Sequence, residues 1–172
     1  MDIGGGSTEF VRGSHVADRF ISVDMGSVRL TERHIRSDPP SAEMIRAVRA
    51  DADACIDEAV RAVGADAPAT VVGLAGTITT VAAIAHGLDR YDRARIHHSY
   101  VGRADIDTIA ADLAAMTSAQ RATLPAMPRG REDVILAGVV ILQGVLARFS
   151  CERVFVSESD ILDGAAMDIA RR

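Results

Sequence analysis

The 172-residue sequence contains no lysine and no tryptophan, and aromatic side chains make up only 3% of it. Domains that bind single-stranded nucleic acid stack the bases on aromatic side chains, so this composition argues against that function. The formal net charge of −5 also argues against a general nucleic-acid binder. Because all 19 basic residues are arginines, any anion site must use guanidinium groups or backbone N–H groups.

Cysteine is scarce as well. Cys55 and Cys151 are too few and too far apart for a disulfide framework or a Cys-x-x-Cys metal site, which is typical of a reducing compartment. The glycine-rich N-terminus lacks the apolar segment of a signal peptide. The apolar run at residues 134–146 is shorter than the ~20 residues of a membrane span. We therefore expect a cytoplasmic protein that does not bind membranes.

The most informative stretch is Asp-Ile-Gly-Gly-Gly-Ser-Thr-Glu at residues 2–9. Consecutive glycines allow the backbone to turn tightly and to approach a ligand closely, because they have no Cβ. We predict that a phosphate group binds four residues of this turn: Gly4, Gly5, Gly6 and Ser7. Asp2 and Glu9 would supply oxygen ligands for Mg²⁺. A glycine-rich hairpin without a ligand is the alternative, but the order acid, hydroxyl, acid around the turn favours a metal–phosphate group.

A second glycine turn follows an apolar run at residues 70–74, which predicts a buried strand. After it we expect a helix from Ile78 to His86. N–H groups at the start of a helix are unpaired and attract anions, so Gly76 and Thr77 are candidates for binding a second phosphate. An ordinary strand-to-helix turn is the alternative for this segment alone. Two such turns in one chain favour two phosphate sites.

Two pairs of arginines are candidates for holding a polyanion. Arg29 and Arg33 lie one turn apart, on the same face of a short predicted helix that Ser27 caps. Arg129 and Arg131 flank a glycine just before a predicted buried helix. For each pair, an exposed or ion-paired surface is the alternative.

Periodicity outlines the remaining elements. We predict a helix that Ser41 caps and Gly64 ends, further helices at residues 103–116, 134–146 and 161–171, and strands at residues 8–12, 19–23 and 153–157. A hairpin followed by alternating strands and helices is typical of an α/β domain with a mixed sheet flanked by helices. The length suits a single domain. Only Met1 precedes Asp2, so we infer that the first strand is incomplete and that the polypeptide starts inside a longer protein.

Five motifs follow one another along the chain: Asp-Ile-Gly-Gly-Gly-Ser-Thr-Glu at 2–9, Met-Gly-Ser-Val-Arg-Leu-Thr-Glu at 25–32, Gly-Thr-Ile-Thr-Thr at 76–80, Arg-x-Asp-Val-Ile-Leu-Ala-Gly at 131–138 and Ser-x-Ser-Asp-Ile-Leu-Asp-Gly at 157–164. In this order they resemble the exopolyphosphatase / guanosine pentaphosphate phosphohydrolase (Ppx/GppA) family. The resemblance implies the RNase H-like fold of the actin / Hsp70 / sugar-kinase superfamily, in which two domains enclose a phosphate site. The chain resembles only the second of these domains, in the short form of the family.

The same resemblance implies hydrolysis of a terminal phosphoanhydride bond of inorganic polyphosphate or of pppGpp, with a divalent metal. Asp2 and Glu9 would bind the metal, and Glu9 would support catalysis. The glutamate regarded as the catalytic base belongs to the first domain. We therefore expect the chain alone to bind phosphate or nucleotide weakly and to hydrolyse polyphosphate poorly or not at all.

Two other functions stay open at this point: a phosphotransferase of the same superfamily, and a non-enzymatic module that binds polyphosphate or an alarmone. The Ser-Thr-Glu ending of the glycine turn and the Arg-Leu-Thr-Glu segment favour the phosphatase. The face that would meet the first domain is expected to be apolar and exposed. This predicts a homodimer, with strand pairing near Met1 as one route.

Overall fold

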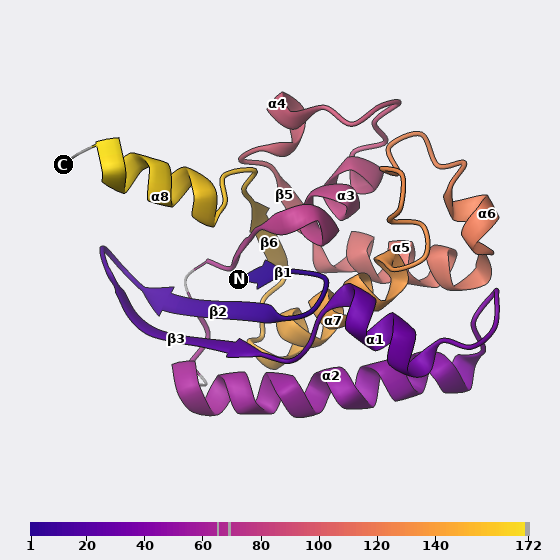
Figure 1. Cartoon of the computed structure of the whole chain (residues 1–172), viewed down its shortest axis with the longest axis horizontal. Coiled ribbons are helices and arrows are strands. Elements are labelled where there is room, and N and C mark those ends of the chain that lie inside the picture. Colours follow the sequence, from indigo (N-terminus) through magenta and orange to yellow (C-terminus); the bar gives the residue numbers. More distant parts are fainter. Residues whose placement is uncertain (65, 69, 171–172) are drawn as a thin grey trace.

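Two three-stranded sheets join into a mixed sheet in the computed structural model, which describes residues 1–64, 66–68 and 70–170 (Figure 1). The antiparallel half has the order β1 (Asp2–Ile3), β2 (Thr8–Gly13), β3 (Ala17–Val23). The other half has the order β4 (Val72–Gly73), β6 (Arg153–Val156), β5 (Tyr100–Gly102), with β4 and β6 parallel. A parallel bridge between Asp2 and Leu74 joins the two halves.

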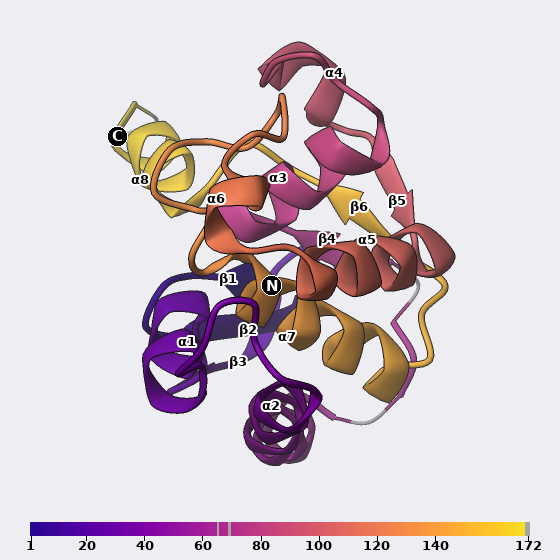
Figure 2. The ribbon, with the colours of Figure 1, turned by 90° about the vertical axis from the view of Figure 1, so that its right-hand side faces the viewer.

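Helices cover the sheet and contribute most of the core. They are α1 (Ser27–His34), α2 (Ala42–Val63), α3 (Ala75–Ala85), α4 (Arg93–Ile96), α5 (Arg103–Ala115), α6 (Ser118–Arg121), α7 (Ile135–Arg148) and α8 (Ile161–Ala170). Figure 2 shows α7 between α2 and α5, and α7 also contacts α1 and α3. The nearly continuous apolar sequence of α7 is therefore buried on all sides, as predicted for a central core helix.

The sequence of α2 explains where the helix begins and ends and which face is buried. The Ser41 side chain accepts a hydrogen bond from the N–H of Met44, and the helix ends at Gly64, where φ is +94°. Its buried residues recur at three- and four-residue spacing: Val48, Ala52, Ile56, Ala59 and Val63. Both predicted ends of this helix are confirmed, because the capping side chain and the glycine act locally.

Two glycines allow neighbouring helices to approach α7 closely, as expected for Gly138 and Gly144. A Cβ on Gly138 would lie 2.6 Å from Cγ2 of Thr77 in α3. A Cβ on Gly144 would lie 2.8 Å from Cδ1 of Ile56 in α2. The first of these contacts buries the Thr77 side chain, which is only 1% exposed.

Other predictions need correction. α1 begins one residue earlier than expected, with Gly26 at the N-cap position and no capping side chain, so the prediction that Ser27 caps it is wrong. α3 begins at Ala75, which places Gly76 and Thr77 inside its first turn. α4 and β5 were not predicted, because each is too short to show a period. The predicted end of the last helix at residue 171 lies outside the described residues.

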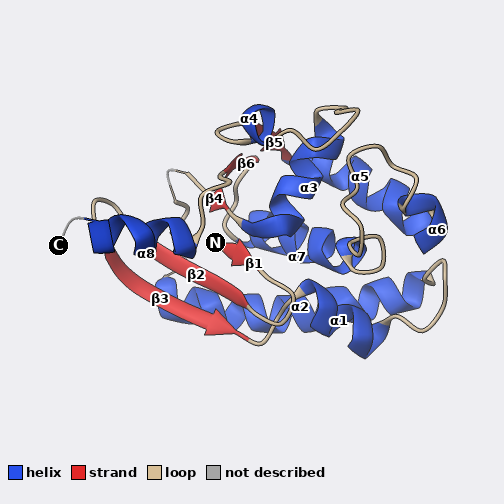
Figure 3. Ribbon diagram, turned by 45° about the horizontal axis from the view of Figure 1, so that its top comes forward, coloured by secondary structure: helices blue, strands red, loops and turns tan. Residues whose placement is uncertain are grey.

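α8 lies at the edge of the molecule (Figure 3). It carries large apolar side chains that are mostly exposed, among them Ile161, Leu162 and Ile169. Over the ranges that the structure describes, no helix is both long enough and apolar enough to cross a membrane.

Candidate functional site

The glycine loop between β1 and β2 rests on the N-terminus of α1. The N–H of Ser27 donates to the Gly4 carbonyl at 2.9 Å, and the N–H of Val28 and of Arg29 donate to the Gly5 carbonyl at 2.9 and 3.0 Å. These bonds occupy N–H groups of α1 that would otherwise lack a partner. The N-terminus of α1 therefore holds the loop in shape, and its first donors are not available to an anion.

The same bonds fix the direction of the loop N–H groups. In a trans peptide the N–H points opposite to the C=O, so the N–H groups of Gly5 and Gly6 point away from α1. Across the described residues, neither N–H donates a hydrogen bond. Gly26 permits this arrangement, since a Cβ there would lie 2.3 Å from the Gly5 oxygen. Two adjacent free N–H groups of this kind are candidate donors to an anion.

The second glycine turn lies beside the first. Gly4 and Gly5 line a pocket of about 350 Å³ together with Ala75, Gly76 and Arg131, and the start of α1 forms part of its wall. The first N–H groups of α3 have no partner within the helix, and no side chain caps them. Two turns that are far apart in the sequence thus line one pocket, although Gly6, Ser7 and Thr77 are not among the residues that line it.

Arg131 lies directly over the first turn of α3. A Cβ on Gly76 would fall 1.7 Å from Nη2 of Arg131, so only glycine leaves room for the guanidinium there. Arg131 is half-buried, and Arg129 beside it is exposed; both line the pocket. Neither takes part in an ion pair with another described residue. A half-buried cation without an acidic partner suits an anionic ligand.

The two arginines of the other predicted pair have different partners. Nε of Arg29 donates to the Gly6 carbonyl at 2.6 Å, and the same guanidinium pairs with Asp24 at 3.2 Å. Arg29 therefore braces the glycine loop. Arg33 pairs with Asp51 of α2 at 2.8 Å and is not among the residues that line the pocket. Of the four predicted arginines, only Arg129 and Arg131 line the pocket, whereas Arg29 holds the loop and Arg33 lies apart from it.

Asp2 and Glu9 face each other across the β1–β2 ladder. Burial raises the pKa of Asp2, and the nearby carboxylates of Glu9 and Asp160 raise it further. Oε1 of Glu9 accepts hydrogen bonds from the hydroxyls of Ser7 and Ser22, each at 2.6 Å. The Ser7 hydroxyl is therefore engaged with Glu9, and its free N–H is the group that remains for a phosphate.

This pair of acids fits part of a magnesium site. Mg²⁺ is usually held by one or two carboxylates and completes its shell with phosphate oxygens and waters. The charge of Asp2 is disfavoured as the protein stands, and a cation would relieve that repulsion. Among the described residues, however, no three His, Cys, Asp or Glu side chains are grouped so that they could hold a metal.

Two residues near the site were not among the predicted site residues. Gly26 is required for the loop to dock on α1. The sequence feature that could have identified it is a glycine immediately before a helix. Asp160 follows β6 and is close enough to Asp2 to raise its pKa. Its signal is an acid just beyond the carboxyl end of a strand, where open α/β sheets place their ligands.

Sheet, helices and pocket together define an α/β domain with a candidate anion site between two glycine turns. The chain belongs to the Ppx/GppA phosphatase family, whose family model matches residues 1–172. It is 41% identical over 174 residues to exopolyphosphatase 2 of Mycobacterium tuberculosis, covering 99% of this chain and 54% of the relative. The resemblance identified from the five motifs is thereby confirmed.

Solved structures of similar proteins support the assignment to this family. An exopolyphosphatase-like protein superimposes with a TM-score of 0.95 at 36% identity, covering 99% of this chain and 58% of that one. The Aquifex aeolicus member of the Ppx/GppA family gives a TM-score of 0.90 at 29% identity, with coverages of 99% and 55%. The fold is the expected RNase H-like fold of the actin / Hsp70 / sugar-kinase superfamily. The chain spans about half the length of these relatives.

Replacing Asp2 with asparagine is expected to stabilise the protein at pH 7 but not at pH 3. Folding raises the pKa of Asp2, so stability decreases as the pH rises from the unfolded value of 3.8 through the folded pKa, and stays lower above it. Asp2→Asn removes this loss, whereas below the unfolded pKa both states are protonated and nothing is gained. Urea unfolding at the two pH values measures the difference.

Asp18→Asn is the control for the loss of one negative charge, because Asp18 is an exposed residue of β3. It should not reproduce the gain at pH 7. Equal stability of Asp2→Asn and the parent chain at pH 7 would contradict the repulsion described for Asp2.

Proposed function

We propose that this chain is the phosphate-binding half of a phosphatase that removes the terminal phosphate of inorganic polyphosphate or of pppGpp. One observation carries the proposal: two glycine turns with free N–H groups line the same pocket, beside an arginine that has no acidic partner among the described residues. Family membership supports hydrolysis, and the Mycobacterium tuberculosis relative is named an exopolyphosphatase. Polyphosphate and pppGpp present the same terminal phosphoanhydride to such a pocket.

Each group of the two glycine turns has a distinct role in this proposal. The free N–H groups of Gly5, Gly6 and Ser7 bind oxygens of the terminal phosphate. The N–H of Gly4 already donates to the Ser7 carbonyl, so Gly4 contributes the tight turn instead of a donor. Because its side chain is buried, Thr77 acts through its backbone N–H at the start of α3.

In this proposal the negative charge of the phosphate is balanced by arginines on one side and by Mg²⁺ on the other. Gly76 leaves room for Arg131, which contacts the phosphate or the next one along the chain, and Arg129 extends the positive surface outward. Mg²⁺ bound to Asp2 and Glu9 would neutralise charge that develops on the phosphate during transfer. The hydroxyls of Ser7 and Ser22 hold Oε1 of Glu9 in place, which is how Glu9 supports catalysis.

This chain covers 54% of the length of the Mycobacterium tuberculosis relative. We propose that the relatives' additional length corresponds to a first domain that closes the pocket and supplies the carboxylate that activates water. This chain would then be the second domain of a cytoplasmic two-domain enzyme. Chemistry of this type depends on positioning, so half of the site binds its ligand better than it transforms it.

A matched pair of arginine variants tests the binding site. Arg131→Gln is expected to weaken binding of tripolyphosphate in the presence of Mg²⁺ by about tenfold, because a charge-assisted hydrogen bond is lost. Arg33→Gln removes the same charge outside the pocket and should change the dissociation constant less than about twofold. Isothermal titration calorimetry measures both. Equal losses for the two variants would mean that net charge, and not the pocket, attracts the anion.

The chain by itself is expected to release no phosphate from long-chain polyphosphate with Mg²⁺, while it still binds tripolyphosphate. A phosphate-release assay on the 172-residue chain, and on a protein extended to the length of its relatives, measures this. Processive release by the chain alone would overturn the assignment of the catalytic base to another domain. Binding without release by the extended protein would favour a sensor, and ADP-dependent capture of phosphate would favour a phosphotransferase.

The isolated chain is also proposed to form a homodimer through α8. Ile161, Leu162 and Ile169 of α8 are 78%, 74% and 73% exposed. Exposed apolar side chains of this kind favour self-association, because association removes them from water. Light scattering should therefore show a dimer that Leu162→Gln combined with Ile169→Gln weakens. A chain that stays monomeric at high concentration would contradict this proposal.

A further inference from the structure

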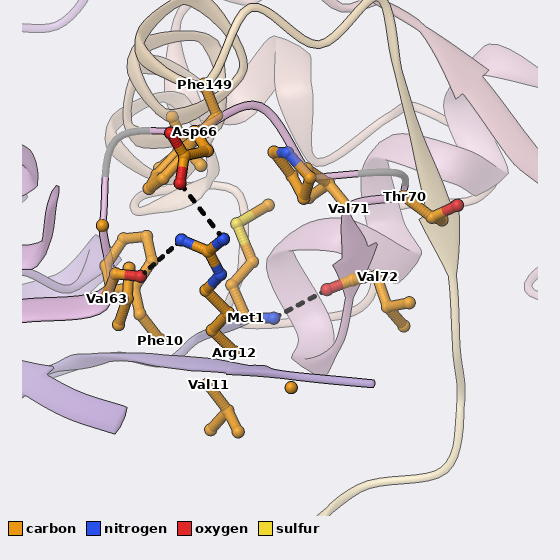
Figure 4. A pocket seen from close by; sticks show the side chains of 14 residues that line it. Met1, Phe10, Val11, Arg12, Val63, Asp66, Thr70, Val71, Val72 and Phe149 are labelled. Atoms are coloured by element: carbon orange, nitrogen blue, oxygen red, sulfur yellow. Dashed lines mark hydrogen bonds and ion pairs between the residues drawn. The ribbon is translucent and has the colours of Figure 1, made fainter. Parts of the chain in front are cut away.

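Arg131 has no acidic partner in the described part of the chain, although the sequence has 24 acidic and only 19 basic residues. Arg12, which lines a separate pocket at the start of β1, shows the more usual arrangement (Figure 4). It donates to the Val63 carbonyl at 2.9 Å and pairs with Asp66 at 3.4 Å. An acid that paired with Arg131 in this way would compete with an anionic ligand. The acids near Arg131 must therefore be engaged elsewhere.

One such acid is Glu158, which follows β6 and is connected to the surroundings of Arg131 through Tyr91. Tyr91 and Arg131 line one pocket of about 410 Å³. Gly76 lines this pocket as well as the phosphate pocket, so the two are neighbours. The Tyr91 hydroxyl donates a hydrogen bond to Oε1 of Glu158. A single tyrosine side chain thus links the carboxylate of Glu158 to the pocket that Arg131 lines.

Glu158 is held by a segment that includes α4. Besides the bond from Tyr91, Nε of Arg93 lies 4.0 Å from Oε2 of Glu158, and Nη2 of Arg93 donates to the Glu158 carbonyl at 3.1 Å. The N–H of Glu158 donates to Nδ1 of His97 at 3.0 Å. The Glu158 side chain is only 11% exposed. Both carboxylate oxygens and both backbone polar groups of Glu158 therefore have partners within residues 91–97.

Tyr91 is a neutral donor at the pH values at which proteins usually work. Burial and then the hydrogen bond to Glu158 raise its pKa to about 12, and the positive charge of Arg131 opposes this rise. The phenol consequently keeps its proton. Its hydrogen bond satisfies an oxygen of Glu158 without using the charge of Arg131.

We propose that Tyr91 is a positioning residue that holds the Glu158 carboxylate away from Arg131, so that Arg131 stays available to the anion. This inference rests on the phosphate site proposed above. Without the Tyr91 hydroxyl, one oxygen of Glu158 loses its donor, and the strongest donor left in the pocket is the guanidinium of Arg131. Such an ion pair would occupy the cation that the phosphate requires. Tyr91 acts through Glu158 and does not have to touch the ligand.

A pair of variants and their combination test the proposal. Tyr91→Phe keeps the ring and removes the hydroxyl, and it should weaken binding of tripolyphosphate with Mg²⁺ by about fivefold, because Glu158 then competes for Arg131. Glu158→Gln removes the competing charge and should tighten binding by up to about twofold. Combined with Glu158→Gln, Tyr91→Phe should no longer weaken binding. Tyr100→Phe, at the one other tyrosine of the sequence and outside both pockets, is the control and should leave the dissociation constant unchanged.

The Nε–H signal of Arg131 in the NMR spectrum gives a readout that needs no ligand. Assigned by its loss in Arg131→Gln, it should exchange with water at least about threefold more slowly in Tyr91→Phe, and at the parent rate in the double variant. If tripolyphosphate does not bind the parent chain, the proposed function fails, and this signal still decides whether Glu158 moves to Arg131. Weaker binding that persists in the double variant would overturn the proposal, because Tyr91 would then act on the ligand itself. So would a Tyr91→Phe variant with unchanged binding and an unchanged Arg131 signal.

Discussion

The docking of the glycine loop on the N-terminus of α1 is the interaction on which the candidate site depends. A run of three glycines has many accessible conformations, and fixing one of them costs more entropy than for any other residue type. Hydrogen bonds from Ser27 and Val28 to the loop carbonyls offset that cost, and Gly26 allows the two segments to touch. The same contact turns the free loop N–H groups outward, so shape and binding capacity have one cause.

α7 performs the equivalent task for the second turn. The close contact between Gly138 and Thr77 seats the start of α3 against the core helix, which fixes the direction of its first N–H groups. Arg131 lies just before α7, and its guanidinium reaches back over Gly76. One buried helix therefore positions both an uncapped helix N-terminus and the cation beside it, and its apolar packing determines the geometry of a polar site.

The sequence was most informative where structure is decided locally. The glycine turn, the Ser41 cap and the Gly64 stop were predicted correctly because each depends on a few neighbouring residues. β5 was missed because its three residues are held by pairing with β6, and no periodicity can show in so short a segment. Arg33 was grouped with Arg29 by helical spacing, yet its partner Asp51 lies on α2, and only the packing of α1 on α2 reveals that pair.

Asp2 shows why the sheet and the site have to be considered together. It belongs to the two-residue strand β1, which pairs with β2 on one side and bridges to Leu74 on the other. That short strand joins the two halves of the sheet, while its one acidic side chain is held near Glu9 and Asp160 at an electrostatic cost. A fold gains no stability from gathering carboxylates in this way, whereas a site that receives a cation and a phosphate requires them. The pairing of β1 with β2 and with Leu74 therefore affects the site as well, because it determines how firmly Asp2 is held against that repulsion.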